Sequence, residues 1–119
     1  MRSLRIINRS DKRGRRFGVW ELYYDNGKLE STGSYKDGER DGYWKQYHSN
    51  GQLYCKGSFK NGNEDRLWEY YDENGIISSK GSYINGERDG IWGLYNGDGI
   101  MITRSLFGRG NFIKGDYII

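Results

Sequence analysis

The sequence contains no proline, and a single cysteine, Cys55, and a single histidine, His48, leave little reactive chemistry. One cysteine excludes a disulfide within the chain, and together the two residues give too few soft ligands for a structural zinc site. No apolar run approaches the roughly 18 residues needed to span a bilayer, and the N-terminus has no apolar run of signal-peptide length. We therefore expect a cytosolic protein without a metal or other cofactor.

Glycine and aromatic residues dominate instead. The chain has 19 glycines among 119 residues, and its 16% aromatic content consists mostly of tyrosine and tryptophan. Aromatic residues favour strands, and glycine supplies the positive φ of tight turns. A helix is disfavoured, because each glycine in a helix interior costs about 1 kcal/mol. The composition predicts sheet and turns within one domain.

A 24-residue period organises the chain. It is marked by Trp20, Trp44, Trp68 and Trp92, each followed after three residues by a tyrosine, namely Tyr23, Tyr47, Tyr71 and Tyr95. Asn-Gly or Asp-Gly pairs begin at 26, 50, 74 and 98, and again at 37, 61 and 85. Such pairs favour the type I′ hairpin turn, in which both central residues have positive φ. The period predicts an all-β fold, an elongated single-layer antiparallel meander of four 24-residue β-hairpin repeats.

The repeats divide the chain into a β-repeat domain at 14–119, with units near 18–41, 42–65, 66–89 and 90–113. Residues 1–13 form a basic N-terminal arm, which the spacing also allows to be half a repeat. Residues 1–17 hold seven basic side chains against Asp11 alone. The basic character therefore belongs to the N-terminus and not to the repeats.

Period-two alternation predicts the two faces of the sheet. In the second strand of a unit, Leu53, Cys55, Gly57 and Phe59 are expected to share one face, as are their equivalents in the other units. In the first strand, tryptophan and the second residue after it point one way. The residue before tryptophan and the repeat tyrosine point the other way. We expect aromatic rings to pack over the glycines of a neighbouring strand, each unit depending on the next.

The unit resembles a known family. The segment 42–53, Gly-Tyr-Trp-Lys-Gln-Tyr-His-Ser-Asn-Gly-Gln-Leu, followed by Gly-Ser-Phe-Lys-Asn-Gly at 57–62, is similar to the bacterial variant of the MORN repeat (membrane occupation and recognition nexus). The resemblance covers about residues 14–110, and unit three departs from it with Arg66 in place of glycine. It implies a twisted array of hairpins without catalytic residues. Members include small antitoxin or immunity-like proteins, while others are linked to membranes, dimerisation or the anchoring of a partner enzyme.

Few residues offer catalysis. Cys55 stands where other units have Ser31, Ser79 and Thr103, and His48 has no histidine equivalent, so both are interpreted as structural. The acidic runs at 39–42, 63–65 and 87–90 are interpreted as charged turn exits that keep sheet edges soluble. Partner binding is expected instead from side chains that vary between units and from the arm. These candidates are Tyr24, Tyr43, His48, Tyr54, Tyr70, Arg13, Arg15 and Arg16.

The leading hypothesis is a non-enzymatic protein-binding repeat module that acts as a stoichiometric inhibitor. Its concrete form is an antitoxin, an immunity protein or a phage anti-defence protein acting on a bacterial partner such as a toxin or defence enzyme. The alternative is binding of an anionic membrane or nucleic acid through the basic arm. A third is a structural role as a homodimer through the open sheet edges.

Overall fold

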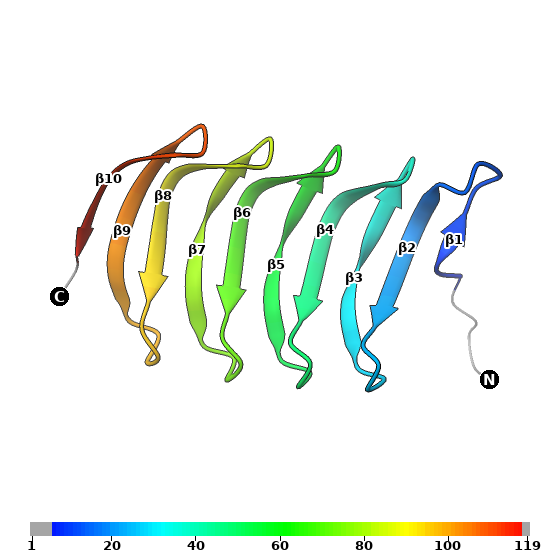
Figure 1. Cartoon of the computed structure of the whole chain (residues 1–119), viewed down its shortest axis with the longest axis horizontal. Helices are drawn as coiled ribbons and strands as arrows, with labels where there is room; N and C mark the ends of the chain where they lie inside the picture. The colour runs from blue at the N-terminus through cyan, green and yellow to red at the C-terminus, as the bar shows by residue number, and fades with distance from the viewer. Residues whose placement is uncertain (1–5, 118–119) are drawn as a thin grey trace.

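Ten strands follow one another through a single antiparallel sheet in the order of the sequence (Figure 1). The computed structural model describes residues 6–117 and has extents of 53 × 30 × 24 Å. The strands are β1 (Arg9–Ser10), β2 (Arg16–Tyr23), β3 (Leu29–Lys36), β4 (Glu39–Tyr47), β5 (Leu53–Lys60), β6 (Asn63–Tyr71), β7 (Ile77–Ile84), β8 (Glu87–Tyr95), β9 (Met101–Gly108) and β10 (Asn111–Tyr117). The predicted elongated single-layer meander is confirmed. Residues 6–117 include no helix long and apolar enough to cross a membrane.

The turns β3–β4, β5–β6, β7–β8 and β9–β10, at the upper edge of the sheet in Figure 1, are of one kind, whereas the β1–β2 turn at the same edge has positive φ only at Gly14. Both central residues have positive φ, as in Asp37-Gly38 at 51° and 84° and Asn61-Gly62 at 52° and 82°, which is the predicted type I′ geometry. Arg109-Gly110 adopts the same geometry, although arginine gives no turn signal. Each turn also contacts the previous one, because its glycine N–H donates to a carbonyl one unit earlier, such as Gly62 to Arg40 at 3.1 Å.

The lower turns differ from the prediction. In the turn at 24–28, only Gly27 has positive φ, and its N–H donates to the carbonyl of Tyr24 at 2.9 Å. This is a type I turn followed by a left-handed glycine, so the type I′ prediction was wrong for these four turns. Side-chain oxygens accept from backbone N–H groups within these turns. Asn26 Oδ1 accepts from the N–H of Lys28 at 2.9 Å and Asn50 Oδ1 from that of Gln52 at 2.8 Å, while in the other two turns the acceptors are Asp72 and Asn96.

Each long first strand bends near its start. The bend occurs where φ is positive, at Gly18, Gly42, Arg66 and Gly90. At the bend the pairing with the preceding strand slips: Asp65 pairs with Ser58, but Trp68 pairs with Gly57, the next residue back along β5. Two residues of β6 are therefore left over opposite β5. Arg66 adopts a left-handed conformation that glycine takes more easily.

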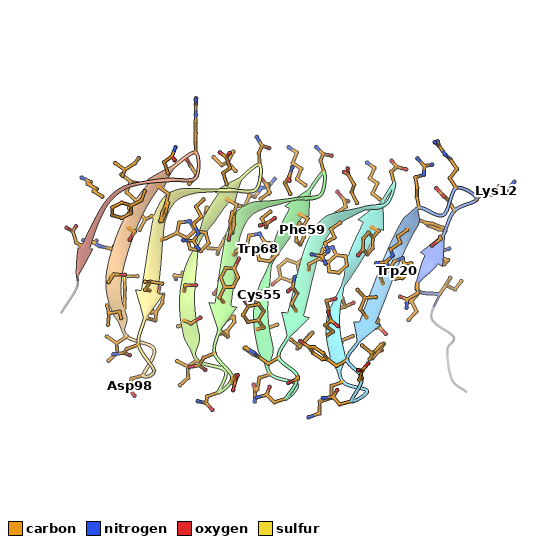
Figure 2. The ribbon with its side chains drawn as sticks, in the orientation of Figure 1. Lys12, Trp20, Cys55, Phe59, Trp68 and Asp98 are labelled. Atoms are coloured by element: carbon orange, nitrogen blue, oxygen red, sulfur yellow. The ribbon has the colours of Figure 1, made fainter. Side chains whose placement is uncertain are left out.

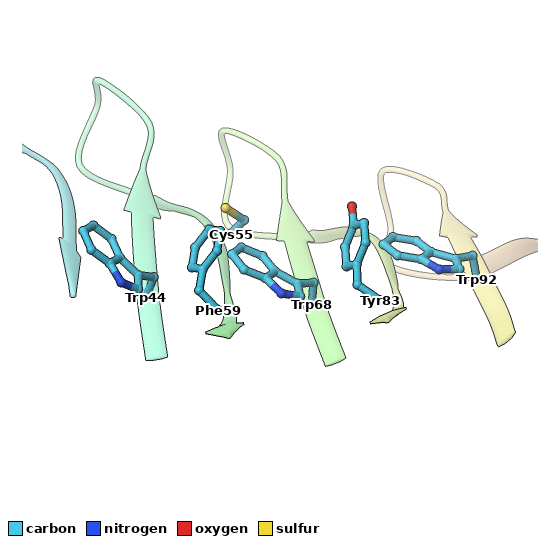
Figure 3. Close-up of a cluster of buried hydrophobic side chains, with 6 residues drawn as sticks. All are labelled: Trp44, Cys55, Phe59, Trp68, Tyr83 and Trp92. Carbon is cyan, nitrogen blue, oxygen red and sulfur yellow. The ribbon is translucent and has the colours of Figure 1, made fainter. Parts of the chain in front are cut away.

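The core is a row of indoles and smaller rings on one face of the sheet (Figure 3). Each inner indole lies over a glycine of the preceding strand. A Cβ added to Gly57 would lie 2.2 Å from Cδ2 of Trp68, and the same separation recurs between Gly33 and Trp44 and between Gly81 and Trp92. Each of these indoles donates its N–H to the carbonyl of the serine after the glycine, at 2.9–3.0 Å. Trp44 has an exposed fraction of 0%. The predicted packing of aromatic rings over bare backbone is thus present.

Rings from the second strands stand edge-on between the indoles. The centroids of Tyr35 and Trp44 are 5.1 Å apart at 89°, and those of Phe59 and Trp68 are 5.0 Å apart at 82°. Figure 2 shows Phe59 and Trp68 side by side in the middle of the sheet, with Trp20 nearer the N-terminal end. Trp20 is only half-buried and donates instead to the carbonyl of Arg9 at 3.1 Å, because no glycine strand precedes it. We call this side of the sheet the ladder face.

One prediction about the faces was wrong. Gln46 pairs with Cys55, but Tyr47 pairs with Leu53, so Tyr54 is a bulged extra residue. Directly opposed residues point to the same side of a sheet, so Leu53 lies with Tyr47 on the second face, away from Cys55. Equivalent register shifts precede Tyr23, Tyr71 and Tyr95. The bulge breaks the period-two alternation on which the prediction depended.

Candidate functional site

Two neighbouring hollows lie on the ladder face over β4 to β8. Their volumes are about 240 and 270 Å³, and Tyr54 and Tyr70 line both of them, so the two hollows lie next to each other. The remaining lining includes Arg40, Cys55, Phe59, Glu64 and Trp68 in the first hollow, and Ser78, Tyr83, Arg88 and Trp92 in the second. We call this the central groove.

Tyr54 reaches the groove because of the bulge. A bulged residue shares a side with its neighbour, and Tyr54 accordingly lies beside Cys55 on the ladder face. Its ring stands edge-on to His48 at 5.0 Å and to Tyr70 at 5.9 Å between centroids. Tyr54 keeps an exposed fraction of 41%. A tyrosine held between two rings and still open to solvent suits contact with a partner.

Tyr70 forms the floor between the two hollows. Its ring is stacked on Trp68 with centroids 6.3 Å apart, and it lies 6.2 Å from Trp92. The hydroxyl groups of Tyr70 and Tyr83 share a hydrogen bond of 2.9 Å. Burial, followed by that hydrogen bond, raises the pKa of Tyr70 far above its usual range, so the phenol stays neutral. The floor is therefore aromatic and fixed in orientation.

Charges of both signs rim the groove. The guanidinium of Arg40 lies 5.1 Å from the ring centroid of Trp44 and 5.4 Å from that of Phe59. Arg88 has the same place on Trp92. The residue at the equivalent position before Trp68 is Glu64, which pairs with Phe59 across β5 and β6. Cation–π contacts thus hold Arg40 and Arg88 against the aromatic rings of the ladder. Glu64 is the acidic residue at the same repeat position.

Three departures from the repeat line this groove. Tyr70 replaces Leu22, Gln46 and Leu94 of the other units, Tyr54 replaces Glu30, Ser78 and Ile102, and Glu64 replaces Arg16, Arg40 and Arg88. Tyr70 also packs against the core, whereas Tyr54 is 41% exposed, so the groove combines a unit-specific floor with a unit-specific side chain open to solvent. The sequence predicted Tyr54 and Tyr70 as candidates but missed Glu64, Arg40 and Arg88. Aligning the four units position by position gives the signal for Glu64.

A family model for the MORN repeat variant matches residues 18–37, 40–61 and 67–85, together more than half of the chain. The chain belongs to the MORN repeat variant family. Its MORN repeats are a module of a kind that generally binds proteins and is generally non-catalytic. No curated protein matches the chain. The matched segments stop before the fourth unit, which retains Trp92 and the sheet pairing of the others.

Tyr24 and His48 connect consecutive MORN units. The hydroxyl of Tyr24 donates to the carbonyl of Tyr47, and Nε2 of His48 lies 2.8 Å from the carbonyl of Tyr71. Both side chains thus reach the repeat tyrosine of the next unit. Their partner-binding role stays a prediction, with His48 also lying against Tyr54 beside the groove. Tyr43 lies apart from both, 54% exposed on the second face.

The basic residues of the N-terminal region have different surroundings. Asp11 accepts from the backbone N–H groups of Arg13 and Arg15, and its Oδ2 pairs with Nε of Arg15 at 2.8 Å. These hydrogen bonds, the one from Arg15 first, lower the pKa of Asp11. Arg16 lies 4.3 Å from the centroid of Trp20 on the ladder. Arg13 is exposed, while residues 1–5 of the predicted arm lie outside the described residues.

The surroundings of Cys55 on the ladder face do not activate its thiol as a nucleophile. Its thiol is buried, and burial raises its pKa from 9.0 to about 11, which keeps it protonated. In the described part of the chain, no three His, Cys, Asp or Glu side chains gather where a metal could bind.

A charged hollow of about 390 Å³ by Glu87 and Asp89 has a counterpart of about 210 Å³ by Glu39 and Asp41. Because the same hollow occurs at equivalent positions of two units, we attribute it to the stacking of the upper turns and not to a ligand site.

Proposed function

We propose that this protein is a stoichiometric inhibitor that binds a bacterial partner protein through the central groove. The observation that carries the proposal is the meeting of Tyr54, Glu64 and Tyr70, the unit-specific residues, in one hollow of a regular array. A repeat array without such differences would present the same surface in every unit. The groove supplies one surface that is unlike the rest and can therefore select a partner.

The chemistry of the groove supports a protein as the ligand. Tyrosine and arginine are enriched at the energetic centres of protein interfaces. Tyrosine covers a large area and loses little conformational freedom, because its side chain has only two χ angles. The groove combines two tyrosines with Arg40, Arg88 and Glu64, so it can pair side chains of either charge.

Inhibition is the form of binding that we favour. The inhibitor would be an antitoxin, an immunity protein or a phage anti-defence protein, acting in the bacterial cytosol on a toxin or defence enzyme. The resemblance of the units to small antitoxin and immunity-like repeat proteins supports this. A protein of this kind acts by occupying its target, one molecule to one.

Capture from the native host tests the proposal. Tagged protein is expected to recover one partner at equal molar yield, and to abolish the partner's activity at a one-to-one ratio. Binding should persist at about 0.5 M salt, which screens contacts made only by exposed arginines. Capture of no protein at stoichiometric yield would contradict the proposal, whereas loss of binding at high salt and in an Arg13→Glu, Arg15→Glu variant would favour the basic arm.

Matched variants locate the surface. Tyr54→Ala removes a 41% exposed tyrosine from the groove, and Tyr43→Ala removes a 54% exposed tyrosine from the second face. We expect Tyr54→Ala to weaken partner binding at least about tenfold, the loss typical of an interface anchor, and Tyr43→Ala to change it less than about twofold. The opposite pattern, measured by titration calorimetry, would move the binding site to the second face.

A further inference from the structure

Three charged side chains follow one another along the ladder face at the same repeat position. Arg40, Glu64 and Arg88 each stand four residues before a ladder tryptophan. Each is paired directly with a ring-bearing residue of the preceding strand, which places it on the ladder face. The tryptophans that follow them lie in one row (Figure 3). The charges along the central groove therefore alternate from positive to negative to positive.

The chain itself does not neutralise these charges. Within residues 6–117, the side chains of Arg40, Glu64 and Arg88 form no ion pair and no hydrogen bond. The two arginines lie over aromatic rings instead, a contact that a carboxylate cannot make. All three charged groups are thus free to pair with groups of a partner.

The sheet sets the spacing between the three charges. Equivalent side chains of successive units are two strands apart, and neighbouring strands lie about 4.8 Å from each other. The charged positions therefore recur about every 10 Å along the groove. A segment that meets all three has to present one side chain at each of these intervals, on one side of its backbone.

A polyproline II helix meets this requirement. It has three residues per turn and rises about 3.1 Å per residue, so every third side chain points the same way at intervals of about 9 Å. In a β-strand, residues three apart point to opposite sides. An α-helix is about 10 Å or more across with its side chains, whereas the two hollows, of about 240 and 270 Å³, have room for a few side chains.

We propose that the central groove binds a polyproline II segment of the partner protein in which a basic residue lies three positions from an acidic residue on either side. The acidic side chains pair with Arg40 and Arg88, and the basic side chain between them pairs with Glu64. The inference rests on the proposed function and names the segment that the groove recognises. Because the charge pattern is symmetric, it is the same for either direction of the bound segment.

The aromatic side chains between the charges suit the same ligand. Tyr54 and Tyr70 line both hollows, and Tyr54 is 41% exposed. Proline-rich segments dock in grooves lined by aromatic rings, because their polyproline II conformation is already formed before binding. Prolines at the intervening positions are therefore expected to contact the tyrosines, while the charges fix the register.

The probe is the peptide Glu-Pro-Pro-Lys-Pro-Pro-Glu with both ends blocked. The control peptide, Glu-Pro-Lys-Pro-Pro-Pro-Glu, has the same composition and net charge, but its lysine is moved by one residue and turned away from Glu64. Added to the ¹⁵N-labelled full chain, the probe is expected to shift the amide resonances of Tyr54, Glu64 and Tyr70. It is expected to bind about fivefold more tightly than the control, the effect of one exposed ion pair. Equal affinities, or no shift of these amides at millimolar peptide, would overturn the inference.

Two protein variants with the same change of net charge complete the test. Glu64→Arg introduces the residue that precedes the other ladder tryptophans, so the fold is expected to persist. It opposes like charges, and binding of the probe is expected to fall at least about tenfold. Glu73→Arg, at an exposed position in a lower turn, is expected to leave binding unchanged. Similar losses in both variants would show that net charge and not the pattern is recognised, which refutes the inference.

A second pair of peptides tests the pattern and the conformation. Glu-Pro-Pro-Glu-Pro-Pro-Glu is expected to bind Glu64→Arg more tightly than the native chain, because its central acid then meets an arginine. A helical peptide with glutamate, lysine and glutamate seven residues apart presents the same charges at about 10 Å. Tighter binding of that helix than of the probe would overturn the polyproline II assignment.

The natural partner separates this inference from the proposed function. A captured partner whose affinity falls in Tyr54→Ala but not in Glu64→Arg keeps the proposed function and refutes the charge pattern. Failure to capture a stoichiometric partner, together with pattern-dependent binding of the probe, refutes the proposed inhibitor and keeps the groove as a site for such a segment.

Discussion

The indole of Trp68 lies over the bare α-carbon of Gly57, so close that an added Cβ would be 2.2 Å from the ring. A separation that short does not occur between a real Cβ and its neighbours, so any side chain at this glycine displaces the indole. The same relation links Trp44 to Gly33 and Trp92 to Gly81. Each indole on one strand packs against the glycine of the preceding strand. We therefore expect each of these contacts to contribute strongly to the free energy of unfolding.

Gly57→Ala should accordingly destabilise the protein strongly. Overpacking of a well-filled core costs about 1–3 kcal/mol, and displacing a buried indole lies at the upper end of that range. We expect the free energy of unfolding in urea to fall by about 3 kcal/mol. Gly97→Ala is the control, because a Cβ there meets no atom within 4 Å. Similar losses for both variants would show that the indole contact is not the cause.

Arg66→Gly should stabilise the protein. Arg66 has φ of 64°, in a place where the other units have glycine, and the left-handed region costs about 1–2 kcal/mol for an L-residue. The side chain is mostly exposed and forms one surface ion pair with Asp65 at 3.2 Å, so little is lost with it. We expect a gain of about 1 kcal/mol. The reciprocal variant, Gly90→Arg, should lose a similar amount in the same thermal unfolding assay.

His48→Ala should weaken the coupling between units two and three. The variant loses the hydrogen bond from Nε2 to the carbonyl of Tyr71, a contribution of about 1 kcal/mol. His48→Tyr should retain stability, because Tyr24 makes the equivalent bond to Tyr47 in the preceding pair of units. Native-state hydrogen exchange measures the effect near Tyr71. Equal exchange rates in both variants would show that the hydrogen bond is not what couples the units.

Cys55 should make stability depend on pH in the alkaline range. Burial raises its pKa from 9.0 to about 11 in the folded protein, so the folded state holds the proton more tightly than the unfolded state. The resulting stability is complete below about pH 9 and is lost as the pH rises towards 11. Cys55→Ser, with the residue of units one and three, should show a smaller fall between pH 9 and 11. The native thiol should react slowly with iodoacetamide at pH 8.

The strands, the repeat and the ladder could be predicted from the sequence because the same residue types recur every 24 positions. Trp44 and Gly57 have a tryptophan and a glycine at the equivalent positions of the next unit, Trp68 and Gly81. The pair Asn61-Gly62 adopts the two positive φ values that a type I′ turn requires. The turn at Asn26 could not be assigned this way, because Asn-Gly fits two turn types and a hydrogen bond to Lys28 decides between them.

The bulge escaped prediction for a different reason. Its residues are Glu30, Tyr54, Ser78 and Ile102, which share no property that marks an extra residue. Strict period-two alternation places Tyr54 on the face opposite Cys55. The central groove could therefore not be predicted from the sequence. Tyr54 and Tyr70 could still be chosen as candidates, because they differ between units. Their roles, like those of Tyr24, Tyr43 and the arginines, stay predictions.

Pairing in this sheet is confined to strands that follow one another directly in the chain. No hairpin has to wait for a segment made later, so contacts form at short sequence separation, which favours fast folding. During synthesis, each unit can settle onto the one before it soon after it leaves the ribosome. The growing end is then always an edge strand, with one side paired to the strand made before it and the other side still open.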